Sequence, residues 1–258
     1  MVQQLVRLES NQEIAQGMFL MRFDSRRIAT SAQPGQFLNI RATQRWSPLL
    51  LRRPFSISRV VGSSIELLYN IVGKGTKALS AQIPGEEIDV LGPLGIPFRY
   101  DGLFETAVLV AGGLGIAPFP FLTDFLEKKK ATIITFVGSR SLFKIDMLHL
   151  RNVQYATDDG SNGFRGNVVE SLAEYLQEHT LTAPKIFGCG PTKMLSSLSR
   201  LAQAKELSCE LSLEGDMACG IGICQGCPVE RSNGTKKYAL VCTDGPTFDC
   251  REIKLPSP

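Results

Sequence analysis

Short hydrophobic runs separated by turn signals dominate the first hundred positions of the chain. Strand-like runs occupy residues 37–40, 55–58, 65–69 and 87–91, and Pro-Gly or glycine-rich turns lie between them. Many short strands at such spacing are typical of an antiparallel barrel or sandwich. We therefore predict an N-terminal antiparallel β-barrel with one short helix over residues 75–80.

The pattern changes after residue 102. A continuous apolar run at residues 107–111 predicts a parallel strand that is buried on both faces. Helical and strand-like segments then alternate, with helices near 119–130, 168–178 and 192–205 and strands near 132–137, 153–157 and 185–187. This alternation predicts a doubly wound parallel α/β domain.

The last segment is rich in glycine and cysteine and has few strong helix formers. It is too short to enclose a sizeable core of its own. The chain is therefore expected to be a multi-domain β plus α/β protein. Its parts would be a barrel over 1–102, an α/β domain over 103–213 and a small cysteine-rich module over 214–258.

Composition narrows the class of protein. Of the 258 residues, 43% are hydrophobic and 21% are charged, which excludes a disordered chain, a collagen and a coiled coil. The net charge of +3 is too balanced to favour nucleic acid or a membrane as the main partner. The sequence has no run of about 18 apolar residues and no signal-peptide core near its start. A cytoplasmic location is expected, where disulfides are rare, so the seven cysteines need another explanation.

Four cysteines carry the most specific signal. Cys219, Cys224 and Cys227 follow the spacing C-x4-C-x2-C, and Cys242 comes after fourteen further residues. This is the plant-type spacing of a [2Fe–2S] cluster, and glycines between the cysteines would let the loop wrap tightly around it. A zinc site and unliganded core thiols are the alternatives, although zinc modules more often pair two C-x2-C units. Cys250 lies nearby and is not assigned as a ligand.

A glycine-rich motif, GGLGIAP at 112–118, directly follows the buried strand and opens a helix. Glycine permits close backbone approach, and a helix N-terminus offers free N–H groups to a dinucleotide pyrophosphate. The glycines concerned are Gly112, Gly113 and Gly115. The alternative is a purely structural strand-to-helix turn.

Three further motifs are weaker when taken singly. GCGP at 188–191 follows a strand and would face the ligand crevice of a parallel sheet, or else it is a simple turn. RRPFSIS at 52–58 offers an arginine, an aromatic ring and hydroxyls on one strand. VGKGT at 72–76 precedes the short helix and could cradle a diphosphate.

These motifs, in this order and nearly end to end, resemble the ferredoxin–NADP reductase superfamily. Within it the chain is similar to the family of electron-transfer subunits of class 1B dihydroorotate dehydrogenases. The resemblance implies that Arg53 meets the pyrophosphate of FAD and that the Ser56 hydroxyl lies near the reactive flavin edge. Many relatives have tyrosine where Phe55 stands, so the flavin contact of this ring is expected to differ.

The resemblance also assigns the remaining positions. The residues implied for FAD are Arg53, Pro54, Phe55, Ser56, Gly73, Gly75 and Thr76. Those implied for NAD(H) are Gly112, Gly113, Gly115, Asp158, Cys189, Gly190 and Pro191. The implied cluster ligands are Cys219, Cys224, Cys227 and Cys242. Asp158 favours NAD over NADP, because a carboxylate accepts bonds from a ribose hydroxyl and repels a 2′-phosphate. A capped surface turn is the alternative for this acidic loop.

The three cofactors imply an electron relay with no catalytic acid or base. Hydride exchange moves two electrons and a [2Fe–2S] cluster passes one, so FAD is expected between NAD(H) and the cluster. The resemblance implies an oxidoreductase subunit of pyrimidine biosynthesis. Its partner would be an FMN-containing catalytic subunit that oxidises dihydroorotate to orotate, in a heterotetramer with two copies of each chain. The alternative is the same cofactor chain serving a sulfide dehydrogenase, a hydrogenase or a bifurcating transhydrogenase. His149 and His179 lie outside every motif and are not expected to be catalytic.

Overall fold

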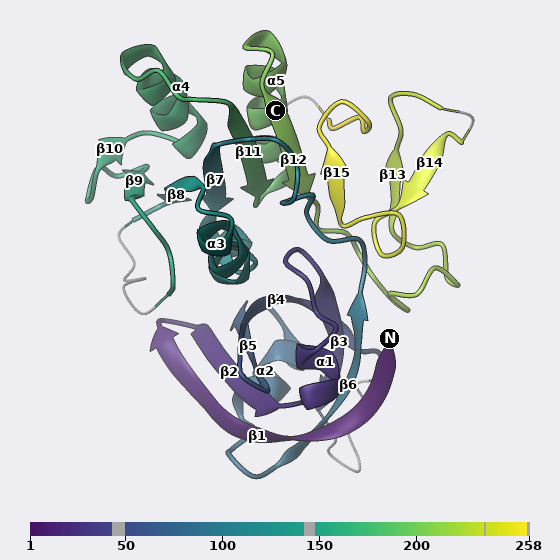
Figure 1. Ribbon diagram of the computed structural model, residues 1–258. Helices are drawn as coiled ribbons and strands as arrows, with labels where there is room; N and C mark the ends of the chain where they lie inside the picture. Colours follow the sequence, from purple (N-terminus) through teal and green to yellow (C-terminus); the bar gives the residue numbers. More distant parts are fainter. Residues whose placement is uncertain (43–49, 142–147, 235, 257–258) are drawn as a thin grey trace.

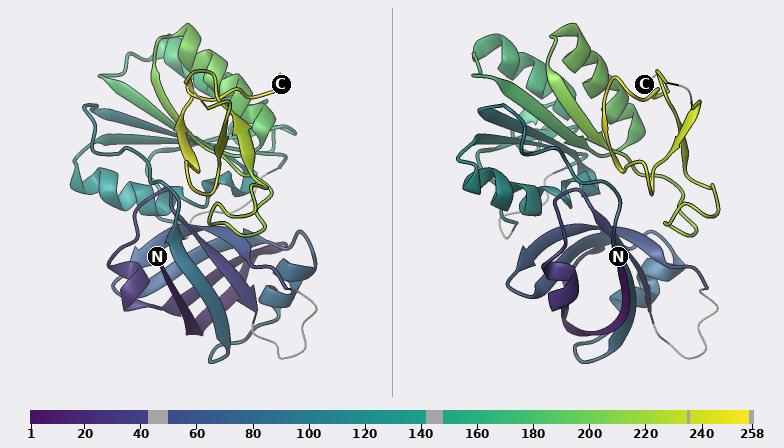
Figure 2. Two further views of the ribbon diagram at one scale, coloured as in Figure 1. Left: turned by 90° about the vertical axis from the view of Figure 1, so that its right-hand side faces the viewer. Right: turned by 45° about the vertical axis from the view of Figure 1, so that its right-hand side comes forward.

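The computed structural model describes residues 1–42, 50–141, 148–234 and 236–256. A β-barrel forms one half of the molecule and a sheet with helices forms the other (Figure 1). The C-terminal segment runs along the side of both halves (Figure 2).

The barrel is closed by six antiparallel strands in the order β1-β2-β5-β4-β3-β6. Its strands are β1 (Val2–Ala15), β2 (Met18–Asp24), β3 (Phe37–Ala42), β4 (Arg53–Val61), β5 (Ser64–Asn70) and β6 (Glu87–Leu94). Two short helices, α1 (Arg26–Ala29) and α2 (Lys74–Ser80), lie in the connections. The predicted antiparallel barrel is confirmed.

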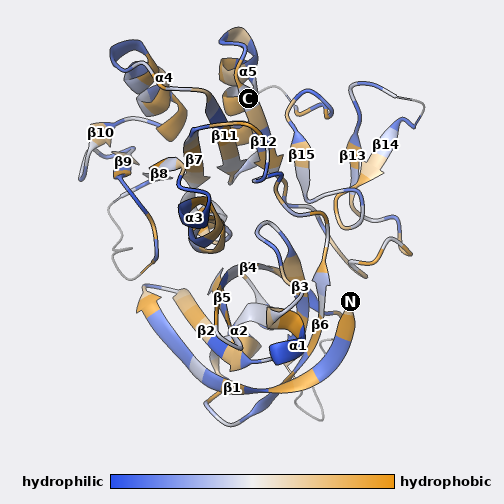
Figure 3. Cartoon of the chain, in the orientation of Figure 1, coloured by the Kyte–Doolittle hydropathy of each residue, from blue (hydrophilic) through white to orange (hydrophobic). Residues whose placement is uncertain are grey.

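The first strand was missed by the sequence analysis. In β1 the buried residues Val6 and Leu8 alternate with the exposed Arg7. Figure 3 shows hydrophilic and hydrophobic bands along this strand. Only a few of its positions are apolar, because the outer face of the strand is in solvent. A strand with one face exposed to solvent therefore has fewer apolar residues, and is harder to recognise in the sequence, than a strand buried on both faces.

The second sheet has seven strands in the order β10-β9-β8-β7-β11-β12-β15, and the first six are parallel. Its strands are β7 (Thr106–Gly112), β8 (Thr132–Ser139), β9 (Val153–Thr157), β10 (Phe164–Arg165), β11 (Pro184–Cys189), β12 (Ser208–Ser212) and β15 (Thr247–Asp249). The helices are the 3₁₀ helix η1 (Gly113–Ile116), α3 (Phe119–Lys128), α4 (Val168–Glu178) and α5 (Thr192–Ala204).

Strand β7 shows why this sheet is doubly wound. Its Val108 and Val110 belong to the core beneath α4 and α5, whereas Leu109 belongs to the core beneath α3. All three side chains are fully buried. The predicted doubly wound α/β arrangement is confirmed, with helices on both faces of the sheet (Figure 1).

The C-terminal segment shares the α/β sheet. Strands β13 (Pro228–Glu230) and β14 (Tyr238–Leu240) form a small hairpin, and β15 then pairs antiparallel with β12. The boundaries at residues 102 and 213 stay a prediction, since the last segment supplies a strand to the sheet before it.

Polar contacts join the two halves, two of them at the linker and at α3. Thr247 Oγ1 donates to the carbonyl oxygens of Ile96 and Pro97, both at 2.9 Å. The C-terminal segment is thus hydrogen-bonded to the linker between the barrel and the sheet. Arg59 of β4 makes a bidentate ion pair with Asp124 of α3, at 3.0 and 3.1 Å. In the parts of the chain that the structure describes, no helix is both long and apolar enough to cross a membrane.

Candidate functional site

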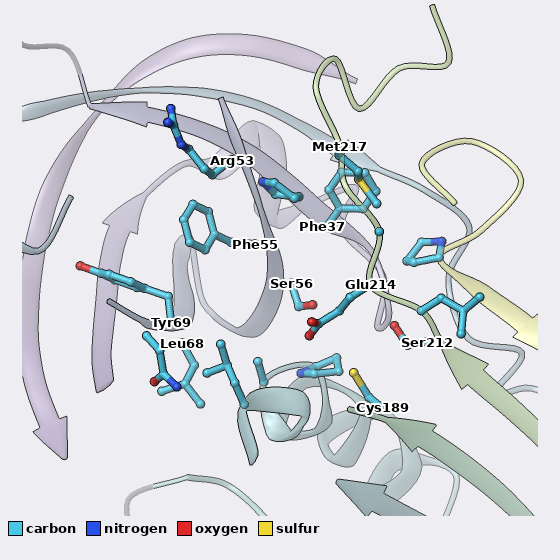
Figure 4. A pocket seen from close by; sticks show the side chains of 18 of the residues that line it. Phe37, Arg53, Phe55, Ser56, Leu68, Tyr69, Cys189, Ser212, Glu214 and Met217 are labelled. Atoms are coloured by element: carbon cyan, nitrogen blue, oxygen red, sulfur yellow. The ribbon is translucent and has the colours of Figure 1, made fainter. Parts of the chain in front are cut away.

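A cavity of about 330 Å³ lies between the barrel and the α/β sheet (Figure 4). It is lined by β4 and β5 of the barrel, by the loop after β7, by the end of β11 and by the segment after β12. Six of the predicted cofactor residues line it, namely Arg53, Pro54, Phe55, Ser56, Thr76 and Cys189. Motifs that lie far apart in the sequence therefore converge on one cavity.

Arg53 and the VGKGT loop form one end of this cavity. The Arg53 side chain lies directly on Gly75, where an added Cβ would be 2.2 Å from Nε. The Thr76 hydroxyl accepts the N–H groups of Val72 and Gly73 at 2.9 and 3.2 Å, so it caps the start of α2. A guanidinium beside a helix N-terminus suits a pyrophosphate, which fits the predicted place of FAD.

Two aromatic rings form the apolar wall. Phe55 meets Tyr69 of β5 edge to face, with 5.6 Å between ring centroids. The Tyr69 hydroxyl donates to Asn11 Oδ1 at 2.9 Å, and burial raises its pKa to about 12. The tyrosine missing at position 55 thus has a neutral counterpart on the neighbouring strand. The sequence analysis missed Tyr69, although an aromatic residue at the end of the predicted strand 65–69 was an available signal.

Polar groups gather at the opposite end of the cavity, where Ser56, Cys189, Ser212 and Glu214 lie close together (Figure 4). Burial raises the pKa of the Cys189 thiol to about 12, so this thiol stays neutral. The cavity walls desolvate the Glu214 carboxyl and raise its pKa, although the open cavity leaves the residue partly exposed. Ser212 and Glu214 were missed, because their only signal is a position at the carboxyl end of β12, where Ser212 is the last strand residue and Glu214 follows two residues later.

The two glycine motifs of the α/β sheet interlock. A Cβ on Gly115 would lie 2.1 Å from the carbonyl oxygen of Cys189, and one on Gly112 would lie 2.8 Å from Pro191 Cδ. Gly190 has a φ of +151° and its own Cβ would lie 2.9 Å from the Gly112 nitrogen. Gly113 also requires a positive φ, +55°. The structure therefore brings both predicted nicotinamide loops together at the carboxyl edge of the sheet.

The acidic loop lies elsewhere, after β9. The backbone N–H of Asp158 donates to Ser139 O at 3.1 Å, which places the loop beside the end of β8. Asp159 accepts the N–H of Ser161 at 2.9 Å, and hydrogen bonds from Ser161 lower the pKa of its carboxyl. Asp159 thus fits the capped turn. Asp158 is exposed just after the carboxyl end of β9 and does not line the cavity.

The four predicted ligand cysteines form two pairs. The backbone N–H of Cys224 donates to Cys219 Sγ and that of Cys242 donates to Cys227 Sγ, both at 3.4 Å. Desolvation raises the pKa of Cys219, but N–H groups of the loop that point at its sulfur lower it overall to about 7. Such a group readily supplies the thiolate that iron needs.

The spacing of the sulfurs fits two irons better than one zinc ion. In the described residues no three of the cysteine sulfurs lie within 4.8 Å of one another. A single tetrahedral zinc would draw all four to about 3.8 Å, whereas two irons need two separated pairs. Cys250 takes no part, because its thiol contacts Cys209 and its backbone N–H donates to Cys209 O at 3.0 Å.

Neither histidine lies in the cavity. His149 contacts Asp124 and Glu127 at 3.2 and 3.0 Å on the outer side of α3. His179 ends α4 and stacks on Tyr175.

Comparisons with known proteins agree with this geometry. Residues 214–254 match a family model described as the iron-sulfur cluster binding domain of dihydroorotate dehydrogenase B. The chain is 35% identical over 252 residues to the dihydroorotate dehydrogenase B (NAD(+)) electron transfer subunit of Shouchella clausii, covering 94% of this chain and 95% of that one. The protein of the same name from Bacillus velezensis is 34% identical, with 96% and 97% covered.

The chain belongs to the family of dihydroorotate dehydrogenase B electron transfer subunits. The predicted resemblance is thereby confirmed.

Solved structures place this family member among flavoprotein reductases. An NADH-dependent reduced ferredoxin-NADP oxidoreductase, studied for flavin-based electron bifurcation, matches with a TM-score of 0.84 and 26% identity over 98% of this chain and 90% of that one. A ferredoxin NADP+ reductase from Neisseria gonorrhoeae, bound to FAD and NADP, matches with a TM-score of 0.63 and 14% identity over 78% and 91%. The second match shows the shared fold alone.

Proposed function

We propose that this chain passes electrons between NAD(H) and a partner that oxidises dihydroorotate to orotate at its own FMN, in pyrimidine biosynthesis. The family membership supports the activity, since the curated relatives are named as electron transfer subunits of an NAD(+)-linked dihydroorotate dehydrogenase. Electrons would run from the partner through the cluster and FAD to NAD⁺.

One structural observation supports the proposal most directly. Gly215 and Met217 line the cavity, and Met217 lies two residues before the cluster ligand Cys219. The wall of the proposed flavin site therefore continues into the proposed cluster loop. When bound, FAD would exchange single electrons with the [2Fe–2S] cluster and a hydride with the nicotinamide, which links the two carriers.

We assign the chain's own residues to binding and orientation. Arg53 and the start of α2 would hold the FAD pyrophosphate, and Phe55 with Tyr69 would form the apolar wall beside its rings. The interlocked loops around Gly115 and Gly190 would present the nicotinamide at the polar end of the cavity. Ser56 and Glu214 would supply hydrogen bonds there, with Glu214 as the titratable group.

The cluster loop offers a route to the partner. Cys224 is exposed, and the neighbouring Ile223 has 78% of its surface exposed. An apolar tip beside an exposed ligand suits a contact in which electrons pass between two chains. We propose an assembly of two copies of each subunit, located in the cytoplasm.

A second candidate keeps the cofactors and changes the partner. The match to the bifurcating oxidoreductase covers 98% of this chain, so a protein of the same fold is described with another role. The higher identity to the dihydroorotate dehydrogenase relatives favours the first candidate. The identity of the partner chain that copurifies with this one would distinguish the two candidate functions.

The test uses the natively assembled protein. The chain is tagged, purified anaerobically with whatever copurifies, and mixed with dihydroorotate and NAD⁺. NADH formation by the complex, with NADH-dependent dye reduction but no dihydroorotate oxidation by the chain alone, is the expected result. If the complex reduces dyes with NADH yet never responds to dihydroorotate, the relay belongs to a different partner.

A further inference from the structure

We propose that Asn39 is a positioning residue that holds the cluster loop against the flavin side of the barrel. The inference rests on the proposed function, because it concerns the distance between the flavin cavity and the cluster. Asn39 lies in β3 and matches none of the sequence motifs.

The contact is direct. Asn39 Nδ2 donates to the carbonyl oxygen of Cys219 at 3.0 Å, across 180 residues of sequence. Asn39 is buried, with 1% of its surface exposed. A side chain of the barrel thus binds the backbone of a proposed iron ligand.

The loop lies on this amide without any gap. Gly220 has a φ of +69°, and a Cβ at that position would lie 2.1 Å from Asn39 Nδ2. A side chain at position 220 would force either the Asn39 amide or the loop to shift, and the positive φ adds backbone strain for any other residue. The glycine and the amide therefore form one close-packed joint.

The joint is adjacent to the cavity on both sides. Asn39 pairs with Pro54 across β3 and β4, and Pro54 lines the cavity. On the loop side, Met217 lines the same cavity two residues before Cys219. A shift of the loop at Asn39 would therefore change the separation between the cavity and the first ligand.

Barrel stability does not account for the amide. Asn39 Oδ1 is buried and has no hydrogen-bond partner in the structure. A buried carbonyl without a donor costs free energy, and a leucine of similar size would avoid that cost. The bond to Cys219 is what the amide provides and an apolar residue cannot.

The test compares Asn39→Leu and the smaller Asn39→Ala with wild type, because neither side chain can donate to Cys219 O. The control is Asn152→Asp, which removes an amide bond to Ile133 O (2.7 Å) in the α/β sheet, away from the cluster, and tolerates the positive φ of +45° at this exposed position. All four proteins are loaded with FAD and cluster, and iron and FAD contents are measured first.

Two readouts then distinguish positioning from general destabilisation. Hydrogen–deuterium exchange of segment 217–224 should accelerate about fivefold or more in both Asn39 variants, which is the shift expected for one lost hydrogen bond, and not in the control. In stopped flow with NADH, flavin reduction should match wild type, whereas the following reduction of the cluster should be slower than in wild type and in the control, because the loop is no longer held at its distance from the cavity.

Unchanged loop exchange and unchanged cluster reduction in a folded Asn39 variant would overturn the proposal. So would loss of FAD with a normal cluster, which would make Asn39 a flavin-site residue. If Asn39→Leu fails to fold, Asn39→Ala decides alone. The measurements need no partner subunit, so an error in the proposed partner would leave their outcome intact.

Discussion

Gly115→Ala tests whether the two glycine motifs act as one nicotinamide site. The new Cβ would lie 2.1 Å from the Cys189 carbonyl oxygen and 2.6 Å from the Gly190 nitrogen, both of which are backbone atoms. Ordinary contact begins near 3.4 Å, so the loops must separate by roughly 1 Å or more. Backbone strain is not involved, since Gly115 does not have a positive φ.

The expected loss follows from that displacement. Overpacking of this kind costs about 1–3 kcal/mol of stability, and a 1 Å misplacement of reacting groups can cost about 10²-fold in rate. We expect NADH-dependent flavin reduction to slow by about 10- to 100-fold. The FAD content and the dithionite reduction of the cluster should remain normal, because Arg53, Gly75 and the cysteine loop lie elsewhere.

The assay is anaerobic stopped-flow reduction of the bound flavin by NADH, with folding checked by urea denaturation. Gly102→Ala is the matched control, because a Cβ there meets no atom within 4 Å. If folded Gly115→Ala protein reduced its flavin as fast as the control, the close approach of the loops would have no role in nicotinamide binding.

Three further outcomes are expected. Cys242→Ser should lose iron and the cluster's visible absorbance while keeping FAD, and Cys250→Ser should keep both; equal iron loss in the two would refute the ligand assignment. Asp158→Ser should raise the KM for NADH about tenfold and narrow the preference over NADPH, as expected for losing a hydrogen bond to a charged acceptor. An unchanged coenzyme ratio would leave Asp158 as a surface residue. The hydrogen bond from His149 lowers the pKa of Glu127 below its ordinary value of 4.5, so the stability it supplies is complete above about pH 4.5 and is lost as the pH falls through the folded pKa. The free energy of unfolding, measured by urea denaturation at a series of acidic pH values, should therefore fall less with decreasing pH in Glu127→Gln than in wild type. An equally steep fall in the variant would contradict this pairing.

The local signals in the sequence were sufficient for much of the fold. The strand at 153–157 and the helix at 168–178 have the predicted bounds. These elements have strong periodicity, and α4 is also capped by Asn167, whose side chain accepts the N–H groups of Val169 and Glu170. Strand β15 was not predicted, because three residues carry no periodicity and it forms only by pairing with β12.

Some parts of the candidate site could likewise be predicted from the sequence, and others could not. The cysteine spacing and the glycine loops could be read from the sequence, since a cluster loop and a phosphate loop each need their residues within a few positions of one another. The tertiary structure alone decided that Tyr69 faces Phe55, that Glu214 enters the cavity and that Asn39 binds Cys219 across 180 residues. The Tyr69–Phe55 contact needs the pairing of β4 with β5, which the strand pattern alone does not place in register. The Asn39–Cys219 contact and the position of Glu214 join segments far apart in the chain, and they depend on how the closed barrel packs against the sheet.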